Sequence, residues 1–426
     1  MVNKNEANET EEEEEGEEEN NLGSESESQS NPGNESEAEK VLSIKGVVYN
    51  EMKGVMSDNS SIFGQQMQAL LFPTTTYHHN SGGEPSEIPK LSYQELLDFH
   101  KTHYHPSNSF FFTYGDLPMR NHFKEINKNV LSKFEKLEKL ETNVQDEKRY
   151  SSPQTHTIEG PLQTHLPAEK QSIASVSWLL SNVTEPFHNF CWSILSHLLT
   201  EEPNGEFFKS LLDSGFGQLF SPGSGFDNHT RESSFSIGVQ GVSPQDAQKL
   251  ESLVFETLNQ VVKEGFPKER IDTVIHQLEI SQKHVTTKFG LSIISNLVTP
   301  WIHGANPSSF LSFTENLERF KKELESGPFL QNLIQQFLLD NPHRLTLIMN
   351  PSANYYQLQS QNESSYLDSL RNDMTPSQLE QIENDANLLK ERQNQSVDNS
   401  CLPTLMISVK KFLLYIYLIF IYSYFY

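Results

Sequence analysis

The sequence predicts an α+β fold, and the pattern of apolar residues supports this in two ways. Short stretches in which apolar and polar residues alternate, such as 172–180 and 233–242, are typical of β-strands. A longer stretch at 250–262 has apolar residues three and four positions apart, which is typical of an amphipathic helix. Segments of both kinds follow one another along 426 residues, a length that accommodates two or three domains.

The charge of the chain is strongly acidic and excludes nucleic acid as a partner. The formal net charge is −25, whereas phosphate binding requires a basic surface. Residues 1–40 contain 15 glutamates and almost no apolar side chains, so they predict a disordered acidic tail. This tail is the opposite of a mitochondrial transit peptide, which is rich in arginine and poor in acidic residues. The acidity of the remainder suits either solubility or the steering of basic peptides.

The part of the chain after the tail predicts helices and one strand. Residues 44–68 predict a helix. A capping box formed by Ser92 and Glu95 opens a second helix, whose apolar residues at 96–99 are expected to face inward. The aromatic run Phe110–Tyr114 predicts a buried strand. A further helix is expected over 121–134.

A polar segment at 141–168 separates this part from a second set of elements. It contains three prolines and predicts an irregular linker. A helix is expected to open at Ser243 and Pro244 and to end at Gly265, because proline suits the first helical position and glycine suits the residue after the last. In chain order, the predicted elements are strand 172–180, helix 186–200, strand 233–242, helix 244–264, helix 271–278 and strand 343–349.

The C-terminal part combines a polar helix with a hydrophobic run. Thr375 and Gln378 form a capping box with proline between them, which predicts a helix that reaches about Arg392. The run 412–426 is too short for a membrane helix, which needs about 20 apolar residues. It is open to three interpretations: a non-native tail, a membrane anchor or an ordinary hydrophobic C-terminus. We expect that 406–426 is not a native transmembrane anchor.

Most catalytic chemistries find no support in the sequence. There is no Gly-x-Ser-x-Gly elbow and no Walker loop, and the glycine-rich stretch 221–226 is interpreted as a turn. Cys191 lies among large apolar residues, as a buried thiol would. The histidines near a helix end (His100, His103 and His105) and the adjacent pair His78 and His79 form no His-x-x-Glu-His or His-Glu-x-x-His run, so we expect none of them to bind a metal.

Several stretches between 41 and 405 resemble those of one family, in the same order and at similar spacings. They are GVVYNEMKG (46–54), LFPTTTYHHNSGGEPSEIPKLSYQELLDFHKTHYHPSNSFFFTYGD (71–116), FFKSLLDSGFGQLFSP (207–222), RESSFSIGVQG (231–241), HRLTLIMNP (343–351) and CLPTL (401–405). The chain resembles the presequence proteases, a branch of the pitrilysin-type zinc metallopeptidases. The resemblance implies tandem pitrilysin-type α/β modules, the first one truncated, followed by the start of a helical linker.

The resemblance also implies a metal site that this chain only partly contains. The family binds zinc through a His-x-x-Glu-His helix, and no such run occurs here. The third ligand of the family lies in a motif similar to Val48–Gly54, which assigns it to Glu51. Without the resemblance, Glu51 would be interpreted as solvated surface. The wider pitrilysin group often has another glutamate seven residues earlier, where this chain has Ile44.

From the residues and the resemblance together, we expect six segments. They are a disordered acidic tail (1–40), the rear part of the first module (41–140), a linker (141–168), the second module (169–350), the start of a helical hairpin (351–405) and a hydrophobic tail interpreted as non-native (406–426).

The implied activity is that of a zinc metalloendopeptidase that degrades unfolded peptides, such as cleaved targeting peptides, in the mitochondrial matrix. We expect this chain to be inactive alone, because the zinc helix and the C-terminal half of the enzyme are not in it. The alternative is a non-catalytic peptide-binding or scaffold fragment, or a gene-model remnant.

Overall fold

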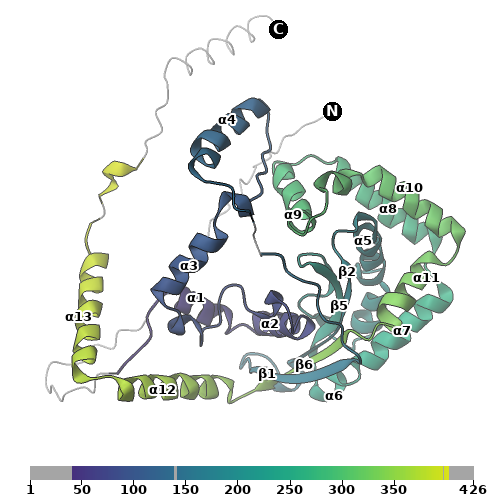
Figure 1. Cartoon of the computed structure of the whole chain (residues 1–426). Helices are drawn as coiled ribbons and strands as arrows, with labels where there is room; N and C mark the ends of the chain where they lie inside the picture. The colour runs from purple at the N-terminus through teal and green to yellow at the C-terminus, as the bar shows by residue number, and fades with distance from the viewer. Residues whose placement is uncertain (1–40, 139–141, 397, 403–426) are drawn as a thin grey trace, which may run out of the picture. The chain divides into compact units, whose positions relative to one another are not determined.

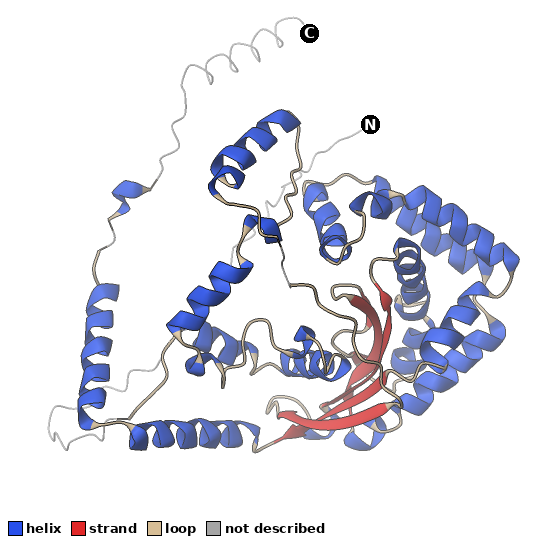
Figure 2. Cartoon of the chain, viewed as in Figure 1, coloured by secondary structure: helices blue, strands red, loops and turns tan. Residues whose placement is uncertain are grey.

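The structure, a computed structural model, describes residues 41–138, 142–396 and 398–402 (Figures 1 and 2). All helices and strands given below lie in the unit Ser43–Tyr426. The expectations for the tail 1–40 and for the hydrophobic run 406–426 lie outside the described residues. The structure mixes helices with one mixed sheet, so the predicted α+β class is confirmed.

We refer to residues 41–138 as the first region of the chain and to residues 142–352 as the second region. One sheet forms the centre of the second region (Figure 2). Its strand order is β1-β6-β2-β5-β3, and β4 also pairs with β5. The β1–β6 pair is parallel and the other pairs are antiparallel. The strands are β1 (Gln154–Pro161), β2 (Ser172–Asn182), β3 (Leu219–Phe220), β4 (Gly225–Asp227), β5 (Glu232–Val242) and β6 (Arg344–Ser352).

Strand β2 is buried on both faces because its side chains alternate between two hydrophobic clusters. Val176 and Trp178 belong to the larger cluster, whereas Ile173 and Leu179 belong to the smaller one. The alternation follows from the period of two residues along a strand. The prediction of strands at 172–180 and 233–242 is confirmed, with small extensions at their ends.

A layer of helices covers the face of the sheet that carries the larger cluster (Figure 1). Helix α5 alone buries eight residues, from Phe187 to Leu199. Gly265 ends α7 with a positive φ of 75°, as the sequence predicts, but the single helix expected over 244–264 is divided into α6 and α7. The helices of this region are α5 (Pro186–Thr200), α6 (Pro244–Ala247), α7 (Leu250–Glu264), α8 (Lys268–Lys283), α9 (Phe289–Ile302), α10 (Phe313–Ser326) and α11 (Phe329–Ile334), with shorter π-helical turns at Phe208–Asp213 and Gln335–Leu339.

Helix α2 (Asn59–Leu71) covers the other face of the sheet. Its residues Ile62, Phe63 and Leu71 join the smaller cluster with side chains of β2 and β6. The sequence predicts one helix over 44–68, whereas the structure has two. Helix α1 (Val47–Val55) ends before Asp58, which caps α2 through its side chain. A cap inside the predicted span therefore divides it.

The region between α2 and the linker differs from its predicted form. Helix α3 (Tyr93–His103) has the predicted capping box, but its residues 96–99 are exposed rather than inward. Phe110–Tyr114 is neither a strand nor buried, so this prediction is wrong. No other described segment pairs with its backbone or covers its rings fully. Helix α4 (Met119–Asn129) follows and buries no residue.

The segment 141–168 is not irregular throughout, which corrects the prediction of an irregular structure; its assignment as a linker stays a prediction. Strand β1 lies within it and pairs with β6. Its sequence is mainly polar because β1 is the last strand in the sheet order and three of its side chains are exposed. Only Ile158 of β1 packs against the smaller hydrophobic cluster, so the strand shows no apolar alternation in its sequence.

Two long helices follow the sheet. Helix α12 spans Tyr355–Asp373, and α13 spans Pro376–Gln393 after the predicted capping box at Thr375. Neither contains a buried residue. None of the described helices combines the length and apolar character needed to cross a membrane.

Candidate functional site

Helix α1 carries the one side chain that the sequence assigns to metal binding. Glu51 lies in the middle of α1 and is exposed, whereas Tyr49 and Met52 on another side of the helix are buried. Within the described residues, the Glu51 side chain forms no hydrogen bond or ion pair. The helix is therefore attached by one side and leaves the Glu51 carboxylate accessible. Its role as a ligand stays a prediction.

The described residues do not fit a zinc ion on their own. Zinc sites usually have four ligands, at least three of them from the protein. No group of three or more His, Cys, Asp or Glu side chains that could hold a metal occurs in 41–138, 142–396 and 398–402. His78, His103 and His105 each contact a nearby backbone group through a ring nitrogen instead.

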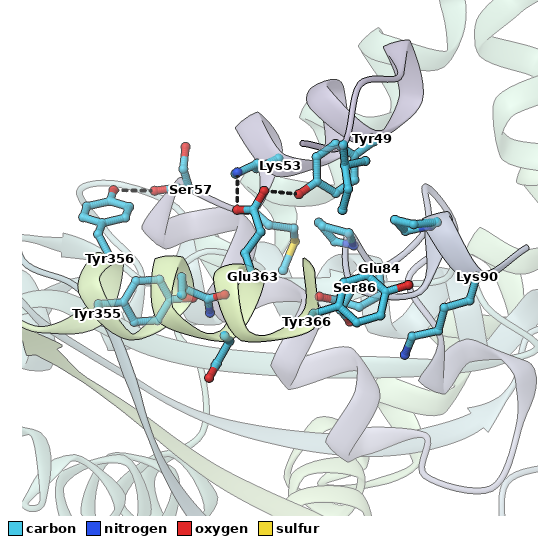
Figure 3. A pocket seen from close by; sticks show the side chains of 16 residues that line it. Tyr49, Lys53, Ser57, Glu84, Ser86, Lys90, Tyr355, Tyr356, Glu363 and Tyr366 are labelled. Atoms are coloured by element: carbon cyan, nitrogen blue, oxygen red, sulfur yellow. Dashed lines mark hydrogen bonds and ion pairs between the residues drawn. The ribbon is translucent and has the colours of Figure 1, made fainter. Parts of the chain in front are cut away.

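An ion pair with α12 fixes the orientation of α1 (Figure 3). The Glu363 carboxylate accepts hydrogen bonds from Tyr49 Oη at 2.9 Å and from Lys53 Nζ at 2.6 Å. The Lys53 ammonium holds the pKa of Glu363 below its usual range. Glu363 lies 314 positions after Tyr49, so no local pattern in the sequence could indicate this contact.

A pocket of about 330 Å³ lies beside this ion pair. Helix α1, the segment 84–90 and helix α12 form its walls (Figure 3). No pattern in the sequence predicts this pocket, because its three walls are far apart along the chain. The residues that line it include four tyrosines and two residues of each charge: Tyr49, Tyr355, Tyr356, Tyr366, Lys53, Lys90, Glu84 and Glu363.

A buried polar network connects the segment after α2 to the sheet. The Glu147 carboxylate accepts hydrogen bonds from the backbone N and the hydroxyl of Thr74. Glu232, on β5, accepts from Glu147 N and from the Arg149 guanidinium, both at 2.6 Å. Burial raises the pKa of Glu232 despite these donors. The network holds 74 and 147–149 to β5 at several points.

His343, the residue before β6, completes this connection. Its side chain is fully buried and stacks on the ring of Tyr150. Nδ1 accepts a hydrogen bond from Tyr150 N at 3.1 Å, so the proton of the neutral ring is on Nε2, which donates to Leu71 O at 2.9 Å. Burial lowers the pKa of His343 to about 4. The ring is therefore a neutral structural element.

The other residues singled out from the sequence contribute to the fold rather than to a reactive site. Cys191 is buried, and burial raises the pKa of its thiol to about 12, so it is not a nucleophile. In the stretch 221–226, a turn at 222–223 leads into β4, which begins at Gly225. A further histidine, His303 at the end of α9, is half-buried, and its Nε2 lies 3.0 Å from Tyr77 Oη, which accepts a hydrogen bond from the backbone N of Arg231.

Comparison with known proteins gives consistent family assignments. The family model described as "Peptidase M16 inactive domain" matches residues 90–278, and a model for the region associated with subfamily C of the same peptidase family matches 349–409. The mitochondrial presequence protease of Xenopus tropicalis is 40% identical over 369 residues, which is 86% of this chain and 36% of that protein. The mitochondrial presequence protease of Mus musculus gives the same values. This chain thus spans 36% of the length of these relatives.

A solved structure supports the same fold. The crystal structure of a peptidase M16 inactive domain from Pseudomonas fluorescens is similar with a TM-score of 0.56 at 16% identity. The similarity covers 72% of this chain and 69% of that one. At this level of identity, the likeness confirms the fold alone.

Proposed function

The chain belongs to the M16 peptidase family, and on this premise we propose that it is part of a zinc metalloendopeptidase similar to the presequence proteases. Its substrates would be unfolded peptides, such as cleaved mitochondrial targeting peptides, in the mitochondrial matrix. The relatives are named mitochondrial presequence proteases and are about three times as long as the matched segment. The matched segment would supply one ligand and the second module of such an enzyme.

We assign Glu51 as the third zinc ligand of the assembled site. The observation that carries this assignment is the arrangement of α1, whose other side is fixed by Tyr49 and Lys53 while Glu51 stays accessible. The two imidazoles and the general base would come from a polypeptide segment with the His-x-x-Glu-His run, which this sequence lacks. The chain alone would therefore not hydrolyse peptides.

The segment 91–137, most of which is exposed, supports a division of the chain into two modules. We propose that 41–140 is the rear part of a first module and that 169–350, together with β1, forms the second. In the first part, Phe110–Tyr114 has no backbone hydrogen bond to another described residue, and four of its aromatic rings are exposed. Its aromatic composition suits a strand that pairs with further polypeptide. The segment that carries the zinc histidines would supply that partner.

Zinc titration tests the assignment of Glu51. We expect the purified chain to bind zinc weakly and no better than its Glu51→Ala variant, and to leave an unfolded presequence-like peptide intact. Addition of a polypeptide with the His-x-x-Glu-His helix should raise zinc affinity, and Glu51→Ala should then lower it by more than the roughly 10- to 100-fold that is typical for loss of a residue that only orients a ligand. The matched control is Glu159→Ala, which removes an exposed carboxylate from β1. Chelator-sensitive cleavage by the chain alone would contradict the proposal.

A non-catalytic role in binding peptides is the second candidate. One observation favours it: the described residues contain no cluster of metal ligands. If the complementing polypeptide binds but zinc affinity does not depend on Glu51, the non-catalytic role is the better description.

A further inference from the structure

The pocket beside α1 lies on a different side of that helix from Glu51. Tyr49, Lys53 and Met56 line the pocket, as expected for residues three and four positions apart on one helix face. Glu51 is two positions from both Tyr49 and Lys53, so its side chain projects elsewhere. A ligand in the pocket would therefore leave Glu51 accessible.

The walls of the pocket are rich in tyrosine. Tyr49 comes from α1, and Tyr355 and Tyr366 come from α12 (Figure 3). Tyr49 is almost fully buried, and Glu363 holds its hydroxyl group. Lys53 Nζ already lies over the Tyr49 ring, 5.7 Å from its centroid, so the tyrosines of α12 are the rings that remain for a ligand. Aromatic rings favour flat or cationic groups, because the face of a ring attracts positive charge.

The charges around the pocket leave one carboxylate without a partner. Lys53 is paired with Glu363, and Lys90 is paired with Glu87 at 2.6 Å. Within the described residues, the side chain of Glu84 forms no hydrogen bond or ion pair. Partial burial raises its pKa, as expected for a carboxylate without a compensating cation. The pocket therefore has an unbalanced negative charge beside aromatic rings.

A guanidinium group has the chemistry that these walls recognise. It is planar, stacks on aromatic faces and donates two parallel hydrogen bonds to one carboxylate. Lysine could supply the charge but not the planar stacking, and an anion would meet Glu84. A volume of about 330 Å³ suits one side chain with part of its backbone rather than a folded partner. The acidic chain, with a net charge of −25, would also attract a basic peptide.

We propose that the pocket between α1, 84–90 and α12 binds the guanidinium group of an arginine side chain in a basic, unfolded peptide. The proposal rests on the proposed function, because targeting peptides are rich in arginine and poor in acid. The pocket gives such a substrate an attachment point on a different side of α1 from Glu51. Glu84 pairs with the guanidinium, and the tyrosines of α12 that line the pocket offer their rings to it.

Peptide binding to the full chain, without zinc, tests this proposal. The probe is a short, fluorescein-labelled, unstructured peptide whose only charges are arginines, and binding is measured by fluorescence anisotropy. Replacing each arginine by citrulline keeps the shape and removes the charge, and should weaken binding at least about tenfold. A lysine version should bind with intermediate affinity. N-acetyl-arginine amide, added in excess, should compete if the guanidinium alone is recognised, whereas no competition assigns recognition to the peptide context and overturns the proposal.

Variants of the pocket locate the binding site. Glu84→Gln should weaken binding of the arginine peptide about tenfold, and Tyr366→Leu should weaken it several-fold without a change in charge. Glu159→Gln removes one exposed carboxylate outside the pocket and should have no comparable effect. Thermal midpoints of all variants establish that they are folded.

Besides a lack of competition by N-acetyl-arginine amide, two results would overturn the proposal. Equal affinity for the arginine and citrulline peptides would exclude guanidinium recognition. A preference for arginine that survives both Glu84→Gln and Tyr366→Leu would place the site elsewhere. Because the assay uses neither zinc nor hydrolysis, its failure leaves the assignment of Glu51 intact, and failure of the zinc titration leaves this proposal intact.

Discussion

Helices α3 and α5 show how differently the two regions of the chain use similar helical sequences. Helix α3 has a complete capping box and apolar residues, yet it buries none of them. Helix α5 has no side-chain cap, yet it buries eight residues against the sheet. Capping and propensity thus determine that a helix forms, whereas burial depends on a partner surface.

The same contrast exists between the aromatic run Phe110–Tyr114 and strand β2. Both are short stretches of strand-forming residues. Strand β2 lies between β5 and β6 and packs on both faces, whereas 110–114 has no strand partner among the described residues. The ring of Phe110 contacts Trp301 but is still 53% exposed. A strand sequence becomes a strand only when another strand satisfies its backbone groups.

The largest expected effect is a difference in the free energy of unfolding between two matched substitutions, one in each region. Phe235→Ala removes a fully buried ring of β5 and should lower the free energy of unfolding by about 3–5 kcal/mol. Phe123→Ala on α4 removes a ring that is 64% exposed and should change it by less than about 0.5 kcal/mol. Urea denaturation of both variants measures the difference. Similar losses would show that α4 packs as tightly as the sheet.

Acid should destabilise the contact between the two regions by protonating His343, which joins Leu71 to Tyr150. Its pKa in the folded chain is about 4, below the usual value of 6.5, so the folded state favours the neutral ring. The stability from the neutral ring is present above pH 6.5 and is lost as the pH falls toward 4, by about 3 kcal/mol. In His343→Gln, this part of the pH dependence should disappear. Parallel pH curves for the wild type and the variant would contradict the assignment.

Two arginines join the segment 146–149 to the start of β5, and they should contribute unequally to the free energy of unfolding. Arg149→Met leaves the buried Glu232 without its cation and should cost about 2 kcal/mol, less than a fully enclosed pair because Arg149 is partly exposed. Arg231→Met breaks a pair whose Asp146 side chain is 61% exposed and should cost less than about 1 kcal/mol. Chemical denaturation at neutral pH compares the two. Equal costs would mean that burial of Glu232 does not control the effect.

The smallest expected effect on global stability is that of the α3 cap. Ser92→Ala removes the hydroxyl that accepts a hydrogen bond from Glu95 N and should destabilise α3 by about 1 kcal/mol. Because α3 buries nothing, the global midpoint should stay unchanged, and only hydrogen exchange within 93–103 should accelerate. Ser243→Ala, at the cap of α6 in the packed region, should lower the global midpoint instead. A global shift from Ser92→Ala would show hidden packing of α3.

The fold of the second region could be predicted largely from sequence because its signals are local. Alternation at β2 and β5, the period of α7 and the glycine after it each depend on residues close in the chain. Strand β1 escaped prediction because a polar edge strand has no apolar alternation. Of the candidate site, the sequence supplied only Glu51, through its resemblance to a family motif.

The sequence by itself determined the helix caps, the buried strands, the acidic charge and the family. Only the tertiary structure decided which apolar faces are covered, where α1 is fixed and that Glu84 lies in a tyrosine-lined pocket. The physical reason is the distance along the chain over which each interaction acts. Caps and periodicity act within one or two turns, whereas the contact of Tyr49 with Glu363 and the network of His343 join residues that are distant in the chain. Such contacts form only after the chain has folded, so no local pattern records them.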